Sequence, residues 1–340
     1  MREAMLYEKL ADKKVRCQVC AYRCVIPSGK NGVCQTRPNR DGTLYTLIYA
    51  EVSSAAADPI EKKPLYHFYP GTGVFSLGTF GCNFRCIHCQ NYNISYVEPG
   101  TESLLPSHHL SPEEAIRLTK RQGCQGIAWT YNEPTIWFEY TYDCARLAKP
   151  QGLYTVYVTN GFITPEALDT IGPYLDAWRV DVKGFSTEFY KKLAHLAKWQ
   201  TILDMAVRAK GKWGMHVEVV TNVIPALNDD EPQLKALAQW IVQALGAATP
   251  WHVTRFYPTA QLTNLPPTPV ATLEKAMRIG KEAGLQFVYV GNVPTHTGEN
   301  TYCPNCGQLD VERVGYRTRV LGVKAGKCTR CGTELNMRGV

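Results

Sequence analysis

The 340-residue sequence lacks any long uninterrupted apolar run. No stretch approaches the roughly 18 consecutive apolar residues of a membrane-spanning helix, so we expect no segment that crosses a membrane. The first residues, Met1 to Met5, carry an early acidic residue and no apolar core, which argues against a secretory signal peptide. Low-complexity tracts and internal repeats are also absent, so we expect no repeat architecture. Since neither a membrane span nor a signal peptide is expected, we expect a cytoplasmic protein.

A strong excess of one charge is also lacking. The chain has 37 Lys and Arg against 30 Asp and Glu, a formal net charge of +7. Such a moderate positive charge fits an anionic substrate or an acidic partner surface, and fits nucleic acid only weakly. A solvated surface with a few extra lysines explains it more simply. With 45% hydrophobic residues, the chain can bury one large core and small satellite units.

Cysteine, in contrast, is abundant. Eleven of the 13 cysteines fall into three tight groups with the spacing of metal ligands. Because we expect no export, these groups indicate metal sites rather than disulfides. The two remaining cysteines, Cys124 and Cys144, are expected to be buried and to act as small hydrophobic residues.

The middle group is Cys82, Cys86 and Cys89, with C-x3-C-x2-C spacing directly after a predicted strand. Thiolates select iron–sulfur clusters, zinc or copper(I). Three of them satisfy three irons of a [4Fe–4S] cluster and leave the fourth iron open for a small molecule. The alternative is a zinc site that uses these cysteines and His88.

Four-cysteine groups flank this loop on both sides. Four thiolates close a tetrahedral shell, so a structural zinc ion is favoured at each group, with a second iron–sulfur cluster as the alternative at the N-terminal one. The C-terminal group has the spacing of a zinc ribbon, which folds a short tail or binds nucleic acid or a partner. The N-terminal group is Cys17, Cys20, Cys24 and Cys34, and the C-terminal group is Cys303, Cys306, Cys328 and Cys331.

Between these groups, short β-branched and aromatic segments alternate with helical ones. This alternation predicts an α/β fold, a partial (β/α)6-7 TIM-like barrel flanked by small N-terminal and C-terminal cysteine-rich metal-binding modules. We divide the chain into an N-terminal module at 1–50, a barrel at 51–298 and a ribbon at 299–340. In the unassigned stretch before the first barrel strand, Lys62-Lys63-Pro64 suggests an exposed turn. The predicted strands are 74–80, 126–131, 154–159, 177–183, 215–224, 251–257 and 287–291.

In such barrels the chemistry lies at the carboxyl ends of the strands. The fourth predicted strand carries Asp181 and Lys183, which the two-residue period places on the same side. Buried charges must be paired, so the two form either a structural ion pair or a site for a zwitterionic ligand, and we favour the ligand site. At the end of the sixth strand, Arg255 is the candidate contact for an anionic substrate. His216 and His252, within strands, are expected to be core histidines.

The cysteine motif and the strand-end motifs resemble those of radical S-adenosylmethionine (SAM) enzymes. The chain is similar to the pyruvate formate-lyase activating enzymes, and more narrowly to the radical SAM member of the AmmeMemoRadiSam system. The motifs that carry this resemblance are the N-terminal cysteines, the 81–91 loop, Tyr131-Asn132-Glu133-Pro134-Thr135, Thr159-Asn160-Gly161, Asp181-Val182-Lys183, Val290-Gly291-Asn292-Val293-Pro294 and the ribbon.

The resemblance implies that Cys82, Cys86 and Cys89 hold a [4Fe–4S] cluster whose open iron chelates SAM. One electron then cleaves SAM to methionine and a 5′-deoxyadenosyl radical, which abstracts hydrogen from a substrate. Asp181 and Lys183 are the implied catalytic residues, near the methionyl carboxylate. The implied cofactor-binding residues are Tyr131, Asn132, Glu133, Thr159, Asn160, Gly291 and Asn292 together with that pair.

The sequence departs from the activating enzymes at three places. Tyr131-Asn132 replaces paired glycines, Gln90 replaces a histidine, and Val158 replaces an aspartate. These departures concern the substrate more than the radical chemistry, so activation of a glycyl radical enzyme stays an alternative. The partners implied are SAM, an electron donor such as flavodoxin or ferredoxin, and Memo-like and Amme-like proteins. The rival from another class is a basic zinc protein that binds nucleic acid, for which Tyr316-Arg317-Thr318-Arg319 is the supporting feature.

Overall fold

The computed structural model describes residues 1–98 and 107–340. Its centre is an eight-stranded sheet in the order β16-β15-β14-β13-β12-β11-β9-β8. The strands from β9 to β16 pair in parallel, and β8 runs antiparallel to β9 at one edge. The strands are β8 (Ser54–Pro59), β9 (Gly73–Gly78), β11 (Gly126–Trp129), β12 (Tyr154–Thr159), β13 (Ala177–Asp181), β14 (His216–Val223), β15 (Trp251–Arg255) and β16 (Val288–Gly291).

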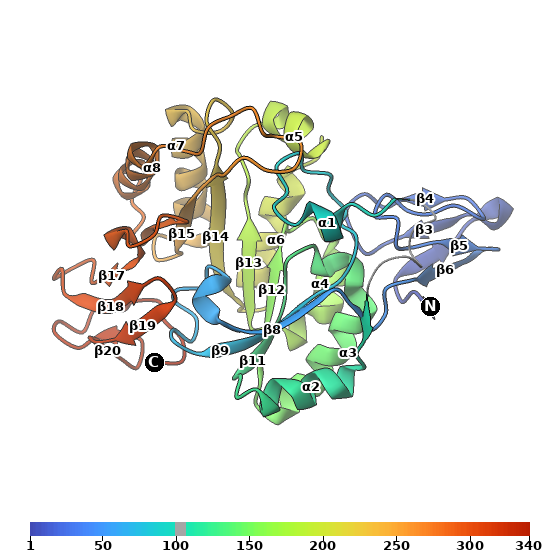
Figure 1. Ribbon diagram of the computed structural model, residues 1–340, viewed down its shortest axis with the longest axis horizontal. Coiled ribbons are helices and arrows are strands. Elements are labelled where there is room, and N and C mark those ends of the chain that lie inside the picture. The colour runs from blue at the N-terminus through green and yellow to red at the C-terminus, as the bar shows by residue number, and fades with distance from the viewer. Residues whose placement is uncertain (99–106) are drawn as a thin grey trace.

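The sheet curves but does not close, because no ladder joins its edge strands β16 and β8 within 1–98 and 107–340 (Figure 1). Successive parallel strands are linked by helices, which lie on the outer face of the sheet. Several of these helices begin at a residue whose side chain accepts a backbone N–H, as at Ser111, Thr164 and Asp230. The helices are α1 (Tyr92–Ser95), α2 (Pro112–Arg121), α3 (Phe138–Ala148), α4 (Pro165–Ile171), α5 (Thr187–Ala194), α6 (Gln200–Gly211), α7 (Glu231–Trp240) and α8 (Val270–Glu282).

The prediction of an α/β fold around a parallel sheet is confirmed, since each of the seven predicted strands appears within a few residues of its expected bounds. Strand β8 was missed because Ser54–Pro59 is made of small residues with no β-branched or aromatic signal. The exposed turn expected at Lys62-Lys63-Pro64 is wrong for Lys63, which is 2% exposed. Its ammonium is buried because Asp58, on β8, lies 2.7 Å away and compensates the charge.

The interior of the sheet carries a buried polar group below the strand ends. Glu218 of β14 accepts hydrogen bonds from His216 at 3.0 Å and from His252 at 2.7 Å. Its carboxylate also accepts the backbone N–H groups of Tyr66 and His67. The expectation that both strand histidines are satisfied core residues is therefore confirmed.

Residues before β8 form two small antiparallel sheets on one flank of the barrel (Figure 1). This N-terminal unit is attached by a buried ion pair, in which Arg37 contacts Glu139 of α3 at 2.6 Å. A bridge between Cys20 and Ile163 and a hydrogen bond from Thr164 N to Val19 O extend the contact. Its strands are β1 (Arg2–Glu3), β2 (Tyr7–Lys9), β3 (Val15–Cys17), β4 (Val25–Ile26), β5 (Asn39–Arg40) and β6 (Thr43–Thr46), followed by β7 (Glu51–Val52), which pairs with β10 (His108–His109).

The C-terminal tail folds against the opposite flank, beside β16 (Figure 1). Its apolar residues do not form a separate core, because they pack on Tyr66, Phe287 and Tyr289 of the barrel. Arg313 donates to Tyr66 O at 2.7 Å and fixes the orientation of the tail. The tail strands are β17 (Thr301–Tyr302), β18 (Leu309–Val314), β19 (Arg317–Val320), β20 (Val323–Lys324) and β21 (Lys327–Cys328).

Among the helices within the described ranges, none is both long enough and apolar enough to cross a membrane.

Candidate active site at the strand ends

The cysteine loop leaves β9 at the carboxyl edge of the sheet, where the strand ends meet. Cys82, Cys86 and Cys89 all line one cavity of about 410 Å³ in the mouth of the sheet. The N–H of Phe84 donates to the Cys82 sulfur at 3.3 Å, which orients that thiol. The loop therefore presents three thiols to a shared space.

The residues present fit an iron–sulfur cluster better than a single metal ion. Tetrahedral zinc holds its sulfur ligands about 3.8 Å apart, given a Zn–S distance of 2.3 Å. Within the described chain, no three ligand atoms from Cys82, Cys86, Cys89 and His88 lie within 4.8 Å of one another. His88 Nδ1 is buried without a hydrogen-bond partner and faces the same cavity, which leaves it available to a bound group.

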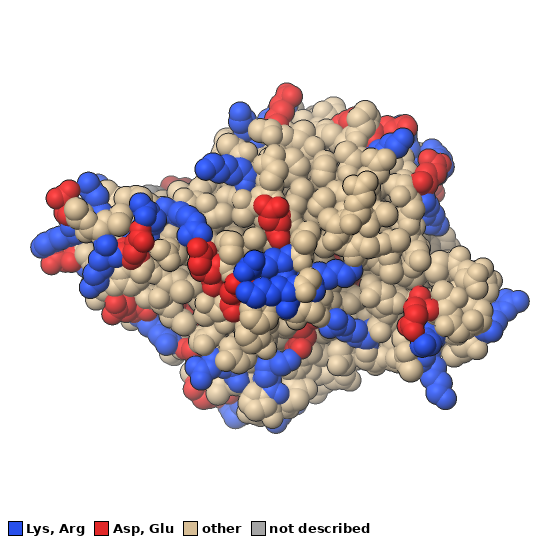
Figure 2. Space-filling model, turned by 180° about the vertical axis from the view of Figure 1, so that it is seen from behind, with Lys and Arg blue, Asp and Glu red and all other residues tan. Residues whose placement is uncertain are grey.

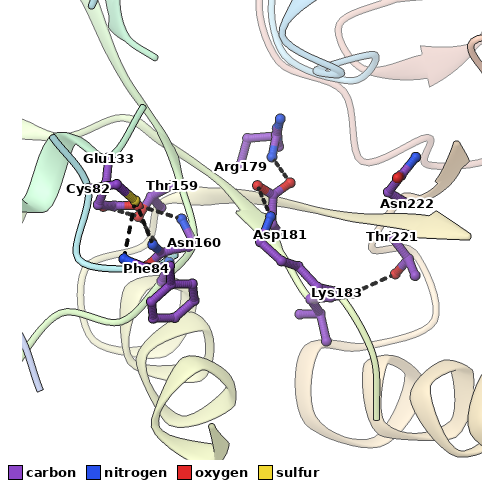
Figure 3. Close-up of polar contacts among 12 residues, drawn as sticks. Cys82, Phe84, Glu133, Thr159, Asn160, Arg179, Asp181, Lys183, Thr221 and Asn222 are labelled. Atoms are coloured by element: carbon purple, nitrogen blue, oxygen red, sulfur yellow. Dashed lines mark hydrogen bonds and ion pairs between the residues drawn. The ribbon is translucent and has the colours of Figure 1, made fainter. Parts of the chain in front are cut away.

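The predicted residues Glu133, Thr159 and Asn160 form one buried group next to Cys82 (Figure 3). The Glu133 carboxylate accepts from Thr159 Oγ1 and from the Asn160 N–H, each at 2.7 Å, and from Thr135 N at 3.0 Å. Burial raises the pKa of Glu133, although these donors oppose the rise. Since both its oxygens are occupied, Glu133 holds the loop after β12 in place, and Asn160 turns its amide toward Cys82.

Asp181 and Lys183 lie together as predicted, with a third charge that the prediction missed. Lys183 Nζ is 3.1 Å from Asp181 Oδ2, and Arg179 forms an ion pair with Asp181 Oδ1 (Figure 3). Burial acts to raise the pKa of Asp181, but the two cations outweigh it and hold the pKa below its usual value. Arg179 precedes Asp181 by two residues, so the two-residue period of the strand predicts that Arg179, Asp181 and Lys183 lie on the same face. All three line the cavity.

A second buried charge cluster closes the β8 side of the cavity. The Asp58 carboxylate accepts from Lys62, Lys63 and the Tyr131 hydroxyl at 2.7 to 2.8 Å. Burial lowers the pKa of Lys63 to about 8, although Asp58 acts to raise it. The sequence pattern indicates no strand or helix in the stretch that carries Asp58, Lys62 and Lys63, so their pairing was not predicted. Only Tyr131, from the loop after β11, is brought to Asp58 by the tertiary fold.

Tyr131 takes the place of a glycine in conformation as well as in position. Its φ of 74° lies in the left-handed region that glycine favours. The hydroxyl bond to Asp58 and a 2.6 Å hydrogen bond from Asn91 to the Tyr131 carbonyl hold it there. The neighbouring Asn132 donates to Gly81 O at 2.7 Å, so this loop also supports the cysteine loop.

The remaining predicted residues are distributed between two adjoining cavities. Asn292 lines both the first cavity and a second one of about 430 Å³, which lies between the strand ends and the ribbon. Gly291 lines only the second cavity, and Thr159 lines neither. Arg255 also lines neither, because its side chain donates to Thr268 O at 2.8 Å.

The three cysteine groups differ in how closely their thiols approach. In the ribbon, the sulfur ligands of Cys303, Cys306, Cys328 and Cys331 all lie within 4.8 Å of one another, and two of the sulfur pairs are 3.5 and 3.7 Å apart. This spacing matches that of a single tetrahedral ion. The N-terminal cysteines line one cavity but, within the described ranges, include no three thiols that meet this limit.

Comparison with known proteins agrees with this geometry. The profile of the Radical SAM superfamily matches residues 77–238, from β9 into α7. A protein of Methanocaldococcus jannaschii named Uncharacterized protein MJ0808 is 44% identical over 339 residues, which cover 99% of each chain. The pyruvate formate-lyase-activating enzyme of Clostridium pasteurianum is 24% identical over 178 residues, which cover 50% of this chain and 71% of that enzyme.

Solved structures show the same fold at low sequence identity. Streptococcus suis SuiB bound to S-adenosylmethionine superposes with a TM-score of 0.50 at 12% identity. The match covers 67% of this chain and 53% of SuiB. At this identity the likeness concerns the fold alone.

Proposed function

Because the chain belongs to the radical SAM superfamily, we propose that it is an enzyme that cleaves SAM reductively and oxidises a substrate by hydrogen abstraction. The observation that carries this proposal is the arrangement of Cys82, Cys86 and Cys89 around one cavity with the Asp181–Lys183 pair. The three thiolates would hold a [4Fe–4S] cluster with one open iron. When bound there, the cluster supplies the electron that splits SAM into methionine and a 5′-deoxyadenosyl radical.

The chain's own residues orient SAM in this proposal. Lys183 carries a charge suited to the methionyl carboxylate, and Asp181 to the methionyl amino group. Arg179 and Lys183 keep Asp181 ionised, since together they lower its pKa despite burial. Glu133 lines the cavity and acts as a positioning residue, because its carboxylate oxygens accept hydrogen bonds from Thr159 and Asn160.

We assign the adenine end of SAM to Gly291 and Asn292, and the surroundings of the methionyl amino group to the loop that carries Tyr131 and Asn132. Asn292 lies at the boundary of the two cavities, where a ligand extending from the cysteine loop would reach. A Cβ added to Gly291 would lie 3.0 Å from Thr254 Cγ2. The backbone of Gly291 is therefore packed closely against Thr254. The second cavity is then left for the substrate.

The second cavity is lined by charges of both signs, among them Lys62 and Glu299, and by Tyr257 and Tyr316. Burial raises the pKa of Glu299 to about 7. The charged and aromatic side chains that line this cavity favour a polar substrate. Such a substrate would enter between the strand ends and the ribbon to reach the radical. The ribbon would hold zinc and complete this wall.

Activation of a protein partner is the second candidate function. The similarity to the Clostridium enzyme, named for activating pyruvate formate-lyase, supports it over half of the chain. We propose Memo-like and Amme-like proteins as partners, a flavodoxin or ferredoxin as electron donor, and the cytoplasm as the compartment. The division into 1–50, 51–298 and 299–340 is part of the same proposal.

Nucleic-acid binding is less well supported. On the face shown in Figure 2, Lys and Arg side chains gather at the centre with Asp and Glu beside them, rather than forming a continuous basic surface. Arg319, in the aromatic and basic stretch that suggested this function, is ion-paired with Glu312 at 2.8 Å. Its charge is therefore partly neutralised.

The experiment is reductive cleavage of SAM by anaerobically reconstituted full-length protein. Reduced protein should release 5′-deoxyadenosine and methionine in equal amounts, slowly without substrate. Replacement of Cys82, Cys86 and Cys89 by Ala should abolish product, whereas Cys124→Ala should have no effect because that cysteine lies outside the cavity. A protein with a confirmed reduced cluster that forms no 5′-deoxyadenosine would refute the proposal.

A further inference from the structure

The N-terminal cysteines lie close to the cysteine loop of the proposed active site, and their thiols are too widely spaced for a single ion. We infer that Cys17, Cys20, Cys24 and Cys34 hold a second iron–sulfur cluster, through which electrons enter. The role in electron entry rests on the proposed SAM cleavage. The identity of the metal group at these cysteines does not depend on it.

Thiol spacing is the first argument. A zinc ion holds its four sulfurs about 3.8 Å apart, as the ribbon thiols do at 3.5 and 3.7 Å. In a [4Fe–4S] cluster each thiolate binds a different iron, so the sulfurs stand at the corners of a larger tetrahedron. Within 1–98 and 107–340, neither the N-terminal group nor the Cys82 loop includes three ligand atoms that all lie within 4.8 Å of one another, whereas the four ribbon sulfurs do. The spacing of these cysteines in the sequence favours zinc, but the distances between their sulfur atoms in the folded chain favour an iron–sulfur cluster.

The surroundings of the N-terminal thiols suit a cluster. Val19, Ile26 and Ile136 line their cavity, which keeps water away from the sulfurs. Arg37 also lines it, with its guanidinium 2% exposed and paired to Glu139. Glu139 neutralises part of this charge, and the positive charge that remains on the wall of the cavity favours the negatively charged cluster that four cysteines produce.

Direct contacts join the two cysteine groups. Asn83 lines the N-terminal cavity, and its Oδ1 lies 3.7 Å from the Cys82 sulfur. Gly81, with φ of 84°, has no room for a side chain, because an added Cβ would lie 3.0 Å from Cys34 O and 2.7 Å from Thr36 Cγ2. One layer of residues therefore separates the sites.

Aromatic rings continue this connection. Tyr22, between two of the N-terminal ligands, lies edge-on to Phe162 with ring centroids 5.1 Å apart. Phe162 in turn packs on Phe84, at 5.5 Å, and Phe84 lines the main cavity between Cys82 and Cys86. The contacts run without interruption from one cysteine loop to the other.

Electron entry through this module follows from its position. Val33, which lines the N-terminal cavity, is 43% exposed, so a donor protein can approach this site closely. A reduced donor of the flavodoxin or ferredoxin class would lose one electron to the cluster held by the N-terminal cysteines, and this electron would then reach the cluster held by Cys82, Cys86 and Cys89. The same electron is consumed when the sulfur–carbon bond of SAM breaks, and no proton is transferred.

Metal content of the anaerobically purified full chain is the first test. We expect about eight irons and one zinc per chain. Cys17→Ala together with Cys20→Ala should remove about half of the iron and no zinc, whereas the control Cys124→Ala should remove neither. About four irons with two zincs in the wild-type protein would overturn the inference, whether or not the double variant folds.

Electron paramagnetic resonance tests the connection between the sites. The dithionite-reduced wild-type protein should show spin–spin broadening from two neighbouring clusters, which the double variant should lose. The ratio of flavodoxin-driven to dithionite-driven SAM cleavage should fall at least tenfold in that variant. Two clusters without magnetic coupling, or an unchanged ratio, would refute the role in electron entry. Absence of any SAM cleavage would instead refute the proposed function and leave the metal count standing.

Discussion

Single side chains at the strand ends have functions that their neighbours determine. Asp181 is held between two cations, Arg179 and Lys183. Of these, Lys183 also lies near Cys86 in the fold, where its charge acts to lower the pKa of the thiol against the effect of burial. Burial acts to lower the pKa of Lys183, but Asp181 raises it, so the ammonium stays charged. A permanent positive charge at this position suits the role proposed for Lys183, which is to bind the methionyl carboxylate of SAM.

Lys183→Met should therefore weaken SAM binding at least tenfold, or about 1.4 kcal/mol, with iron content unchanged. Because the ion pair between Asp181 and Arg179 remains in this variant, the free energy of unfolding should fall by only about 1–3 kcal/mol. Calorimetric titration with SAM on the cluster-loaded protein measures the effect. Arg179→Met is the matched control, since it also leaves Asp181 with one cation. Equal affinities in the wild type and in folded Lys183→Met would show that the pair is structural.

The protonation of Glu299 makes the free energy of unfolding depend on pH. Burial raises its folded pKa to about 7, above the value of about 4.3 in the unfolded chain, although Arg313 opposes the rise. A raised pKa contributes stability below the unfolded pKa, and this contribution is lost as pH rises through about 7. Stability of the wild type should therefore fall between pH 5 and 8 more than that of Glu299→Gln.

Urea unfolding at both pH values measures this difference. Glu282→Gln, at an exposed glutamate of α8, is the control and should follow the wild type. Parallel pH profiles for the wild type and Glu299→Gln would contradict the expectation.

At the scale of elements, the cysteine loop is positioned by the loops around it. Asn132 of the loop after β11 donates to Gly81 O, and Asn160 of the loop after β12 donates to Asn83 Oδ1 at 2.7 Å. The Arg85 guanidinium donates to the carbonyls of Ser95 and Val97 and closes the loop on its other side. The geometry of the three thiols thus depends on segments distant in sequence.

Gly81→Ala should disturb this arrangement more than Gly29→Ala. Both glycines have positive φ, at 84° and 75°, so both changes carry a similar backbone cost of about 1–2 kcal/mol. An added Cβ at Gly81 also meets Cys34 O and Thr36, whereas at Gly29 nothing lies within 4 Å. Thermal unfolding and iron content should both fall further for Gly81→Ala. Equal losses would show that the N-terminal unit does not press on the loop.

At the scale of the molecule, the ribbon and the edge of the barrel share a small apolar cluster that is separate from the main core. The tail shares an apolar cluster with Phe287 and Tyr289, and His67 bonds to the carbonyl of Leu335 at 2.7 Å. Asn336 donates to Ala248 O at 2.8 Å. Folding of the tail therefore stabilises the β16 edge of the sheet.

Loss of the ribbon metal should lower the melting temperature of the whole chain. Cys303→Ser with Cys306→Ser should remove one zinc and shift a single calorimetric transition down by several degrees, because the barrel loses its cover over Phe287. Cys144→Ala, a change at a buried cysteine outside the metal groups, is the control for iron and zinc content. A separate early transition, with the main one unmoved, would show that the tail folds independently.

The sequence by itself determined the order of strands and helices, the three cysteine groups and the Asp181–Lys183 pair. These follow from local periodicity and spacing, which depend only on residues near one another in the chain. The expected residues Glu133, Thr159 and Asn160 were also found from motifs, although their mutual bonds were not.

Only the tertiary structure decided the rest. Strand β8 exists because it pairs with β9, and the Tyr131 hydroxyl reaches Asp58 because the sheet places the loop after β11 beside β8. Arg255 donates to the Thr268 carbonyl, so the tertiary fold turns it away from the cavities. The spacing of thiols is likewise a property of the folded chain. The four sulfurs of the ribbon all lie within 4.8 Å of one another, whereas in the N-terminal group no three described sulfurs do. Sequence spacing limits which cysteines can meet, but packing sets the distance between their sulfur atoms, and this distance determines which metal they can hold.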